Sequence, residues 1–175
     1  MITEKITDKI VNLYPFTPTE EQMEAIKAMS HFVAMSAERQ VFLLKGYAGT
    51  GKTTLVATLV KALKQMRRKV ILMAPTGRAA KGFSTYSGFM AYTIHKRIYR
   101  QKSIVDNTSF QLNVNNYEDT LFIVDESSMI SNQGLSGNMF GTGRLLDDLI
   151  TYVYSSKSCS LLLLGDSAQL PPVGE

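Results

Sequence analysis

Four short apolar runs, separated by longer segments in which apolar positions recur at helical spacing, make up most of the chain. The runs are rich in Val, Ile, Leu and Phe and have the length of strands, so they predict strands at 41–45, 69–75, 121–125 and 159–166. The other segments predict helices at 17–37, 53–66, 77–84, 90–98 and about 143–155. Buried strands that alternate with helices are typical of a parallel sheet with helices on both faces, which predicts an α/β fold.

The helix at 17–37 begins with clear start signals. Thr17 is predicted as the N-cap, Pro18 as the first helical residue, and Glu20 as the partner that closes a capping box. Its apolar face is predicted to hold Ile26, Met29, Phe32 and Val33.

Two further segments lie outside these predicted elements. Residues 1–15 are predicted to be a short, partly helical lead-in to the domain. Residues 101–119 are rich in Asn, Ser and Gln, and they predict an exposed excursion for which a hairpin is one option.

The stretch GYAGTGKTTL follows the first predicted strand and opens the next predicted helix. Its spacing is the P-loop pattern, in which glycines let successive backbone N–H groups point into one concavity around phosphates. Lys52 is predicted to place its charge on the β- and γ-phosphates of ATP, and the Thr53 hydroxyl to ligate Mg²⁺. The alternative, a glycine turn with an incidental lysine, does not explain the flanking strand and helix. The predicted nucleotide ligands in this stretch are Gly46, Ala48, Gly49, Thr50, Gly51, Lys52, Thr53 and Thr54.

Two adjacent carboxylates, Asp125 and Glu126, come directly after the third predicted strand. A P-loop ATPase needs one carboxylate to hold Mg²⁺ and another to orient or deprotonate the attacking water. Asp125 is therefore predicted as a metal ligand together with Thr53, and Glu126 as the catalytic base. Two neighbouring acids are most often a solvated turn, but their place after a strand downstream of a P-loop favours catalysis.

The stretch GDSAQLPPVG follows the fourth predicted strand. The neutral Gln169 amide can donate to a γ-phosphate oxygen, so Gln169 is predicted to sense that phosphate, and the prolines behind it stiffen the segment. The alternative is a capped loop with an ordinary glutamine. Because loops at the carboxyl ends of parallel strands carry the ligands, four strand ends are expected to converge at one edge of the sheet, with Gly46, Pro75, Asp125 and Asp166.

The composition is that of a globular protein. Of 175 residues, 45% are apolar and 19% are charged, and the length fits one domain. The net charge of +4 is compatible with a nucleic-acid partner and too small to indicate one by itself. The single cysteine, Cys159, excludes an internal disulfide, and its apolar surroundings favour a core residue over a nucleophile. Neither a leader nor an apolar run of about 18 residues is seen, so the expected location is the cytoplasm.

Six stretches, in this order, resemble motifs of superfamily 1 DNA helicases of the B class, close to the RecD-like and Dda-like enzymes: TPTEEQ, GYAGTGKTT, APTGRAAK, TIH, VDESSM and GDSAQLPPVG. The resemblance implies that residues 16–175 form the first RecA-like motor domain, a P-loop NTPase domain of an ATP-dependent helicase or translocase with 5′-to-3′ polarity. It also implies that Gln22 reads adenine, that Asp125 and Glu126 serve Mg²⁺ and water, and that Gln169 senses the γ-phosphate.

In the same family, the segments that resemble APTGRAAK and TIH contact single-stranded DNA, which is the partner that the resemblance implies. The residues support this in part, because a helix that starts near Thr76 would direct N–H groups at an anion, and Arg78 and Lys81 can donate to phosphates. His95 can stack or hydrogen-bond, and Tyr92 can stack on a base. Alternatively, Arg78 and Lys81 form a solvated face and His95 is a satisfied buried histidine. The predicted DNA contacts are Pro75, Thr76, Arg78, Lys81, Thr93 and His95.

Two features depart from the family pattern. The glycine-rich stretch 132–143 is longer than the usual link after the acid pair, and the chain stops one residue after PPVG. A second RecA-like domain is therefore expected as a partner within a longer parent chain. Two other function classes stay open from the residues alone. A P-loop kinase or general NTPase that acts on a small molecule is disfavoured by GDSAQLPPVG. A module that binds nucleotide without turnover is disfavoured by the intact set Lys52, Thr53, Asp125 and Glu126.

Overall fold

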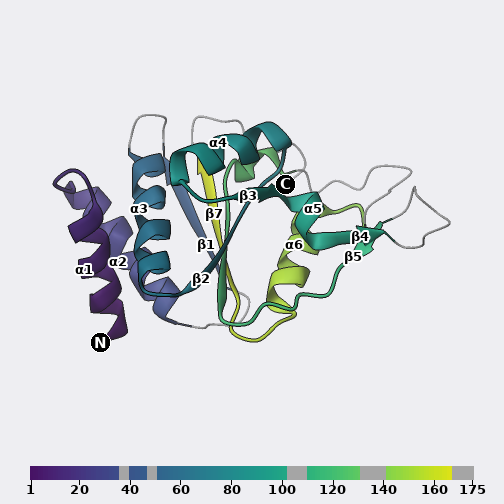
Figure 1. Cartoon of the computed structure of the whole chain (residues 1–175), viewed down its shortest axis with the longest axis horizontal. Coiled ribbons are helices and arrows are strands. Elements are labelled where there is room, and N and C mark those ends of the chain that lie inside the picture. The colour runs from purple at the N-terminus through teal and green to yellow at the C-terminus, as the bar shows by residue number, and fades with distance from the viewer. Residues whose placement is uncertain (36–39, 47–50, 102–109, 131–140, 167–175) are drawn as a thin grey trace.

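The computed structural model describes residues 1–35, 40–46, 51–101, 110–130 and 141–166 of the chain. Its centre is a parallel sheet of five strands in the order β1-β7-β6-β2-β3 (Figure 1). The bounds are β1 Val41–Gly46, β2 Lys69–Ala74, β3 Ala91–Thr93, β6 Thr120–Val124 and β7 Ser160–Asp166. The predicted parallel sheet is confirmed, with β3 as a strand that the sequence pattern did not predict.

Helices cover both faces of this sheet. They are α1 (Ile2–Leu13), α2 (Glu20–Ala34), α3 (Lys52–Gln65), α4 (Gly77–Ser87), α5 (Ile94–Ile98) and α6 (Leu145–Tyr154), and a 3₁₀ turn, η1, lies at Ser127–Met129. In Figure 1, α1, α2 and α3 lie on one side of the strands and α5 and α6 on the other. Alternate residues of β7 serve the two cores, since Leu162 and Leu164 pack with the first group and Leu161 and Leu163 with the second. The predicted α/β fold is confirmed.

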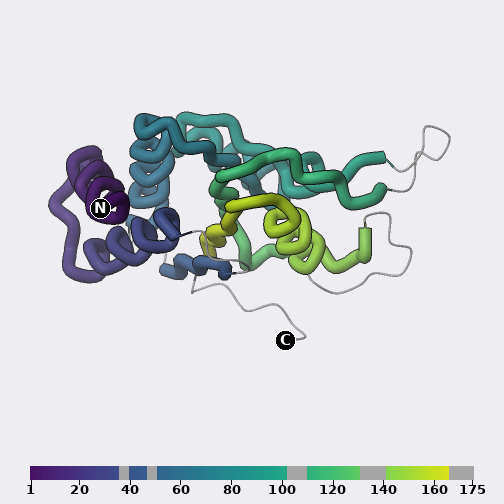
Figure 2. Tube along the Cα trace, turned by 90° about the horizontal axis from the view of Figure 1, so that it is seen from below, coloured from purple at the N-terminus to yellow at the C-terminus, as the bar shows by residue number. Residues whose placement is uncertain are grey.

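A small antiparallel pair extends away from the main sheet. Strands β4 (Tyr99–Gln101) and β5 (Phe110–Leu112) pair at the end of the molecule opposite α1 and α2, as the two views in Figures 1 and 2 agree. The hairpin that was one option for 101–119 is therefore confirmed at its base. The centre of that segment, 102–109, lies outside the described residues.

The start of α2 differs from the prediction by two residues. Thr19, not Thr17, is the N-cap: its hydroxyl accepts from the Gln22 N–H at 3.1 Å, and Gln22 Oε1 accepts from the Thr19 N–H at 3.0 Å. The segment TPTEEQ holds two overlapping capping-box patterns, and the structure uses the second. Pro18 consequently precedes the helix. The predicted apolar face is confirmed, because Ile26 and Met29 are fully buried and Phe32 and Val33 pack against the same core.

The helix predicted over 90–98 is wrong in its first half. Residues Ala91–Thr93 form β3 alongside β2, with Tyr92 opposite Met73. The Thr93 hydroxyl accepts from the Lys96 N–H at 3.2 Å, so Thr93 is the N-cap and α5 begins only at Ile94. The strand satisfies backbone groups at the edge of the sheet that a longer helix would leave unpaired.

Two smaller predictions concern the core and membrane insertion. Cys159 is buried, in agreement with a core residue. None of the helices in the described ranges is long and apolar enough to cross a membrane.

The N-terminal segment is more than a lead-in. Residues Ile2–Leu13 form the complete helix α1, which packs against α2 and α3. Ile6 and Ile10, one turn apart on its inner face, are both 0% exposed and belong to the main core. The first helix is therefore an integral part of the domain.

Replacement of Ile6 by Ala should destabilise the domain by about 2–5 kcal/mol, because a fully buried side chain is truncated and leaves a cavity. Urea unfolding followed by circular dichroism measures this change. Ile2→Ala is the matched control on the same helix, since Ile2 is 45% exposed and should change stability by only about 0.5 kcal/mol. Equal effects of the two variants would contradict the packing of α1.

Candidate active site

The carboxyl ends of the central strands meet at one edge of the sheet, as predicted. In the register of β1 and β7, Gly46 lies opposite Asp166. The Asp125 N–H, just after β6, donates to the Met73 carbonyl of β2 at 3.0 Å. Pro75 follows β2 directly. The chain segments that carry the predicted chemistry are therefore neighbours in space.

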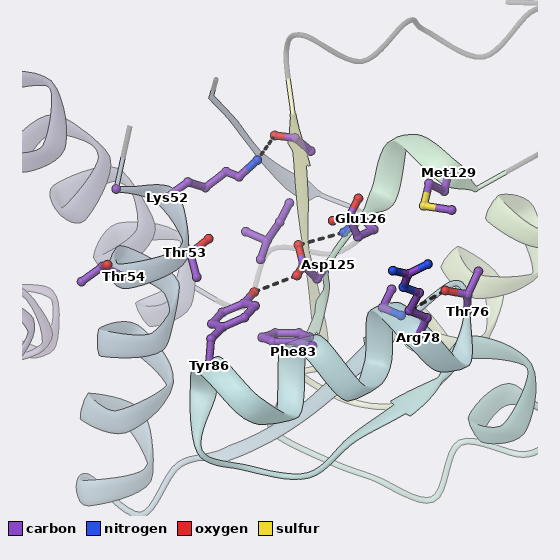
Figure 3. Close-up of a pocket in the computed structure, with 15 residues that line it drawn as sticks. Lys52, Thr53, Thr54, Thr76, Arg78, Phe83, Tyr86, Asp125, Glu126 and Met129 are labelled. Atoms are coloured by element: carbon purple, nitrogen blue, oxygen red, sulfur yellow. Dashed lines mark hydrogen bonds between the residues drawn. The ribbon is translucent and has the colours of Figure 1, made fainter. Parts of the chain in front are cut away.

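A cleft of about 830 Å³ opens at this edge. Three elements form its walls: the first turn of α3, one face of α4 and the turn from β6 into η1 (Figure 3). The end of β7 closes the remaining side. The lining residues are Gly51, Lys52, Thr53, Thr54, Thr76, Arg78, Ala79, Gly82, Phe83, Tyr86, Asp125, Glu126, Met129, Leu164 and Gly165.

Gly51 marks the entry from the P-loop stretch into α3. Its φ of +85° lies in the left-handed region, which favours glycine. A Cβ at this position would lie 2.8 Å from Gln22 Nε2 and 3.3 Å from the Tyr14 hydroxyl, so the site also lacks room for a side chain. Gln22 thus lies against the end of the P-loop stretch. Three further predicted nucleotide ligands, Ala48, Gly49 and Thr50, lie outside the described residues.

The first turn of α3 presents a cation and two hydroxyl groups to the cleft. Lys52 Nζ donates to the Gly165 carbonyl at 2.7 Å, which holds the ammonium at the end of β7. Thr53 and Thr54 follow on the same turn, and the Thr53 hydroxyl is directed toward Asp125 (Figure 3). Because α3 begins at Lys52, the positive end of its dipole faces the cleft. This wall is suited to an anion.

Asp125 is held by two donors. The Tyr86 hydroxyl donates to Oδ2 at 2.9 Å, and the Glu126 N–H donates to Oδ1 at 2.8 Å (Figure 3). Burial, together with the negative charge of Asp125, raises the pKa of the Tyr86 hydroxyl far above its usual value. Tyr86 therefore remains a protonated donor that holds the Asp125 side chain in place.

Glu126 adopts an unusual backbone conformation. Its φ of 54° and ψ of 39° lie in the left-handed region, which is uncommon for a residue with a side chain. The following turn, η1, is attached to β7 because the Ser127 hydroxyl donates to the Leu164 carbonyl at 2.8 Å. The turn directs both Asp125 and Glu126 to the cleft. Strained backbone of this kind is concentrated at functional sites.

The residues predicted to contact DNA fall into two groups. On α4, the Thr76 hydroxyl caps the helix by accepting from the Ala79 N–H at 3.1 Å. Arg78 is exposed and lines the cleft, whereas Lys81 is exposed outside it. The predicted helix start at Thr76 is therefore confirmed.

The second group lies on the connection from β3 to α5, away from the cleft lining. Thr93 is the N-cap of α5. His95 is half-buried against the Tyr99 ring, with 5.6 Å between ring centroids. Burial lowers the pKa of His95, so its imidazole is neutral at pH 7. The Arg97 guanidinium lies 4.1 Å from the centre of the Tyr92 ring, so Tyr92 already makes a cation–π contact.

The donor set in the cleft fits Mg²⁺ bound jointly with a nucleotide. Within the described ranges, no group of three or more His, Cys, Asp or Glu side chains could hold a metal by itself. Mg²⁺ is commonly bound through one or two carboxylates plus substrate phosphates. Thr53 and Asp125, together with phosphate oxygens, would supply such a set.

One polar residue of the cleft was not predicted from the sequence, and one predicted residue is not among those that the structure describes. Tyr86 was not predicted, although 78, 82 and 86 are spaced by four residues and so share a face of α4. Gln169, the predicted phosphate sensor, lies outside the described residues, as does 131–140 of the glycine-rich stretch.

Comparisons with known proteins agree with this geometry. Residues 17–175 match the AAA domain family. An uncharacterized protein of Methanocaldococcus jannaschii is 30% identical over 186 residues, which cover 99% of this chain and 15% of that protein. The ATP-dependent RecD2 DNA helicase of Deinococcus radiodurans is 31% identical over 138 residues, or 78% of this chain and 17% of that helicase. The chain thus spans less than a fifth of the length of either relative.

Two solved structures share the fold. The Pif1 helicase from Candida albicans superposes with a TM-score of 0.53 at 21% identity. The matched region covers 91% of this chain and 34% of the Pif1 chain. A Bacteroides Pif1 in complex with ADP-AlF4 superposes with a TM-score of 0.51 at 24% identity. Here the matched region covers 90% of this chain and 34% of the Pif1 chain. The family match, the helicase relative and the shared fold lead to one conclusion: the chain belongs to the AAA domain family and is a helicase-like P-loop ATPase domain with the RecA-like fold.

Proposed function

We propose that this domain binds and hydrolyses Mg-ATP and uses the energy to move 5′-to-3′ along single-stranded DNA. The observation that carries the proposal is the convergence of Lys52, Thr53, Asp125 and Glu126 on one cleft. One relative is named as an ATP-dependent DNA helicase, and one structure of the same fold is a complex with ADP-AlF4. Both support a nucleotide as the ligand of this cleft.

The phosphates would lie at the first turn of α3. Here Lys52 would exchange its hydrogen bond with the Gly165 carbonyl for the β- and γ-phosphates, because a charged acceptor is stronger than a neutral one. Thr53 and Asp125 would hold Mg²⁺, which would neutralise phosphate charge. Gln22, which lies beside Gly51, would contact the adenine, as the resemblance implies.

Hydrolysis needs a base beside the attacking water. Glu126 fits this role because its left-handed backbone directs it to the cleft next to Asp125. Glu126 would take a proton from the water while the water oxygen attacks the γ-phosphorus. The bond from that phosphorus to the β-phosphate oxygen would break, and Lys52 would stabilise the negative charge left on this oxygen. Gln169 would sense the γ-phosphate, as the resemblance implies.

The DNA path is proposed to cross the first half of α4 and the β3–α5 connection. Thr76, Arg78 and Lys81 lie on the first, together with Pro75 before it, and Thr93 and His95 lie on the second. Movement along DNA requires a second gripping unit whose separation from the first changes with nucleotide state. We therefore propose a second RecA-like domain of the same parent chain as the partner. The limited coverage of the relatives agrees with this.

Lys52→Ala should weaken ATP binding by about 10²-fold or more. A charge pair at about 4 Å in an effective dielectric of about 20 contributes about 4 kcal/mol before desolvation is subtracted. Titration of the chain with a fluorescent ATP analogue in Mg²⁺ measures the affinity. Lys61→Ala, an exposed lysine further along α3, is the matched control and should bind normally. An unchanged affinity in Lys52→Ala would refute the nucleotide site.

Glu126→Gln should separate binding from hydrolysis. The amide preserves the size of the side chain but cannot act as a base, so nucleotide affinity should stay within about twofold while turnover falls about 10²-fold or more. The analogue titration and a phosphate-release assay on the same preparation give the two numbers. If affinity and turnover fell together, Glu126 would have a structural role instead.

Replacement of both Arg78 and Lys81 by Ala should reduce the salt dependence of single-stranded DNA binding. Each cation that contacts a phosphate contributes close to one unit to the slope of log affinity against log salt, so the slope should flatten by about one to two units. Neutral His95 adds no unit at pH 7. The control is Lys5→Ala with Lys27→Ala, two exposed lysines on α1 and α2. An unchanged slope after the replacement of Arg78 and Lys81 would place the DNA path elsewhere on the domain.

A further inference from the structure

Helix α4 belongs to both proposed binding regions. Its start, the outer end of the helix, holds the exposed residues Thr76 and Arg78, and its last turn, the inner end, holds the half-buried Tyr86 beside Asp125 (Figure 3). Arg78 and Tyr86 are eight positions apart, which corresponds to about 12 Å along a helix axis. A displacement of one end of such a short, continuous helix must move the other end as well.

A side-chain hydrogen bond attaches the inner end of α4 to the acid pair. The Tyr86 hydroxyl donates to Asp125 Oδ2 at 2.9 Å, while Oδ1 is already used by the Glu126 N–H. Tyr86 and both residues of the acid pair also line the same cleft. The orientation of the Asp125 carboxylate therefore depends on where α4 places Tyr86.

The Tyr86 ring has little freedom to move independently of its helix. It stacks on Phe83, with 5.1 Å between ring centroids and an interplanar angle of 24°. Phe83 is 0% exposed and belongs to the core beneath α4. A side chain fixed in this way transmits a helix displacement to its hydroxyl, since the packed core resists local repacking.

We propose that Tyr86 is the positioning residue of the metal carboxylate Asp125, and that this bond transmits DNA binding at the outer end of α4 to the Mg²⁺ site. The inference rests on the proposed function, because it takes Asp125 as the Mg²⁺ ligand and α4 as part of the DNA path. Its observations are the Tyr86–Asp125 bond, the Tyr86–Phe83 stack and the position of Arg78 on the same helix.

Tyr86 orients Asp125 without blocking the metal. A carboxylate oxygen accepts two hydrogen bonds or ligands, so Oδ2 keeps one position after the tyrosine has donated. Partners that orient a ligating side chain in this way commonly contribute 10- to 100-fold to metal affinity. Without the hydroxyl, the Asp125 carboxylate would be ordered only when Mg²⁺ binds, and this ordering would lower the affinity for Mg²⁺.

The test measures the gain in nucleotide affinity that Mg²⁺ provides. A fluorescent ATP analogue is titrated into the chain in saturating Mg²⁺ and in EDTA, and the ratio of the two dissociation constants is compared between wild type and Tyr86→Phe. The variant keeps the ring and its stack on Phe83. We expect the ratio to fall about tenfold, with affinity in EDTA unchanged, whereas general damage to the site would weaken both measurements.

Tyr99→Phe is a matched control, because the Tyr99 hydroxyl also donates to an aspartate, Asp148 Oδ2, at 2.6 Å and lies outside the cleft lining. It should leave the ratio unchanged. An unchanged or increased ratio in Tyr86→Phe would overturn the positioning role. If wild type itself showed no nucleotide binding or no gain from Mg²⁺, the proposed function would fail before any variant was compared.

The second arm tests transmission along α4. The titrations are repeated with a saturating oligothymidine, which should change the Mg²⁺ ratio of wild type by at least about twofold and leave that of Tyr86→Phe unaltered. If the oligonucleotide changes the ratio equally in both proteins, or changes neither, transmission through this bond is overturned while the positioning role stands on the first arm.

Discussion

The pairing of β7 between β1 and β6 is the constraint on which the site depends. Parallel pairing places the carboxyl ends of all three strands at the same edge, with Gly46 opposite Asp166 and Val124 opposite Leu163. The P-loop stretch and the acid pair follow β1 and β6, which are not adjacent, and β7 supplies both the spacing between them and a contact to each. Lys52 donates to its Gly165 carbonyl and Ser127 to its Leu164 carbonyl. Because β7 is covered on both faces by separate cores, its register cannot slip without exposing one of them.

Much of this architecture follows from the sequence because apolar runs and glycine spacing are local signals. The strands β1, β2, β6 and β7, the parallel sheet and the position of the acid pair at a strand end were all predicted and confirmed. Prediction from local signals fails where the same segment fits two local structures. TPTEEQ contains two capping boxes, and only the packed structure selects Thr19 over Thr17. The segment 91–93 has helical neighbours, yet pairing with β2 gives it a partner that no local pattern reveals.

The site shows the same division between local and long-range information. The motif residues of α3 and the acid pair could be named from spacing alone. Tyr86 could not, because its role depends on a contact across 39 positions in sequence to Asp125. Lys52 likewise was predicted as a phosphate ligand, while its bond to Gly165 required the fold. Residues that act on a ligand are visible in motifs, and residues that hold those residues in place are visible only in three dimensions.

The crowding around Gly51 has a consequence for where this domain can be divided. The family match begins at residue 17, which would suggest that α1 is an optional extension. Tyr14, immediately after α1, lies with Gln22 against the space where a Gly51 side chain would be. The backbone entering α3 is thus enclosed by groups from upstream of the matched region as well as from within it. A shortened gene product that starts where the family match starts would lose part of the wall beside Gly51, so the structural unit begins earlier in the chain than the family match does.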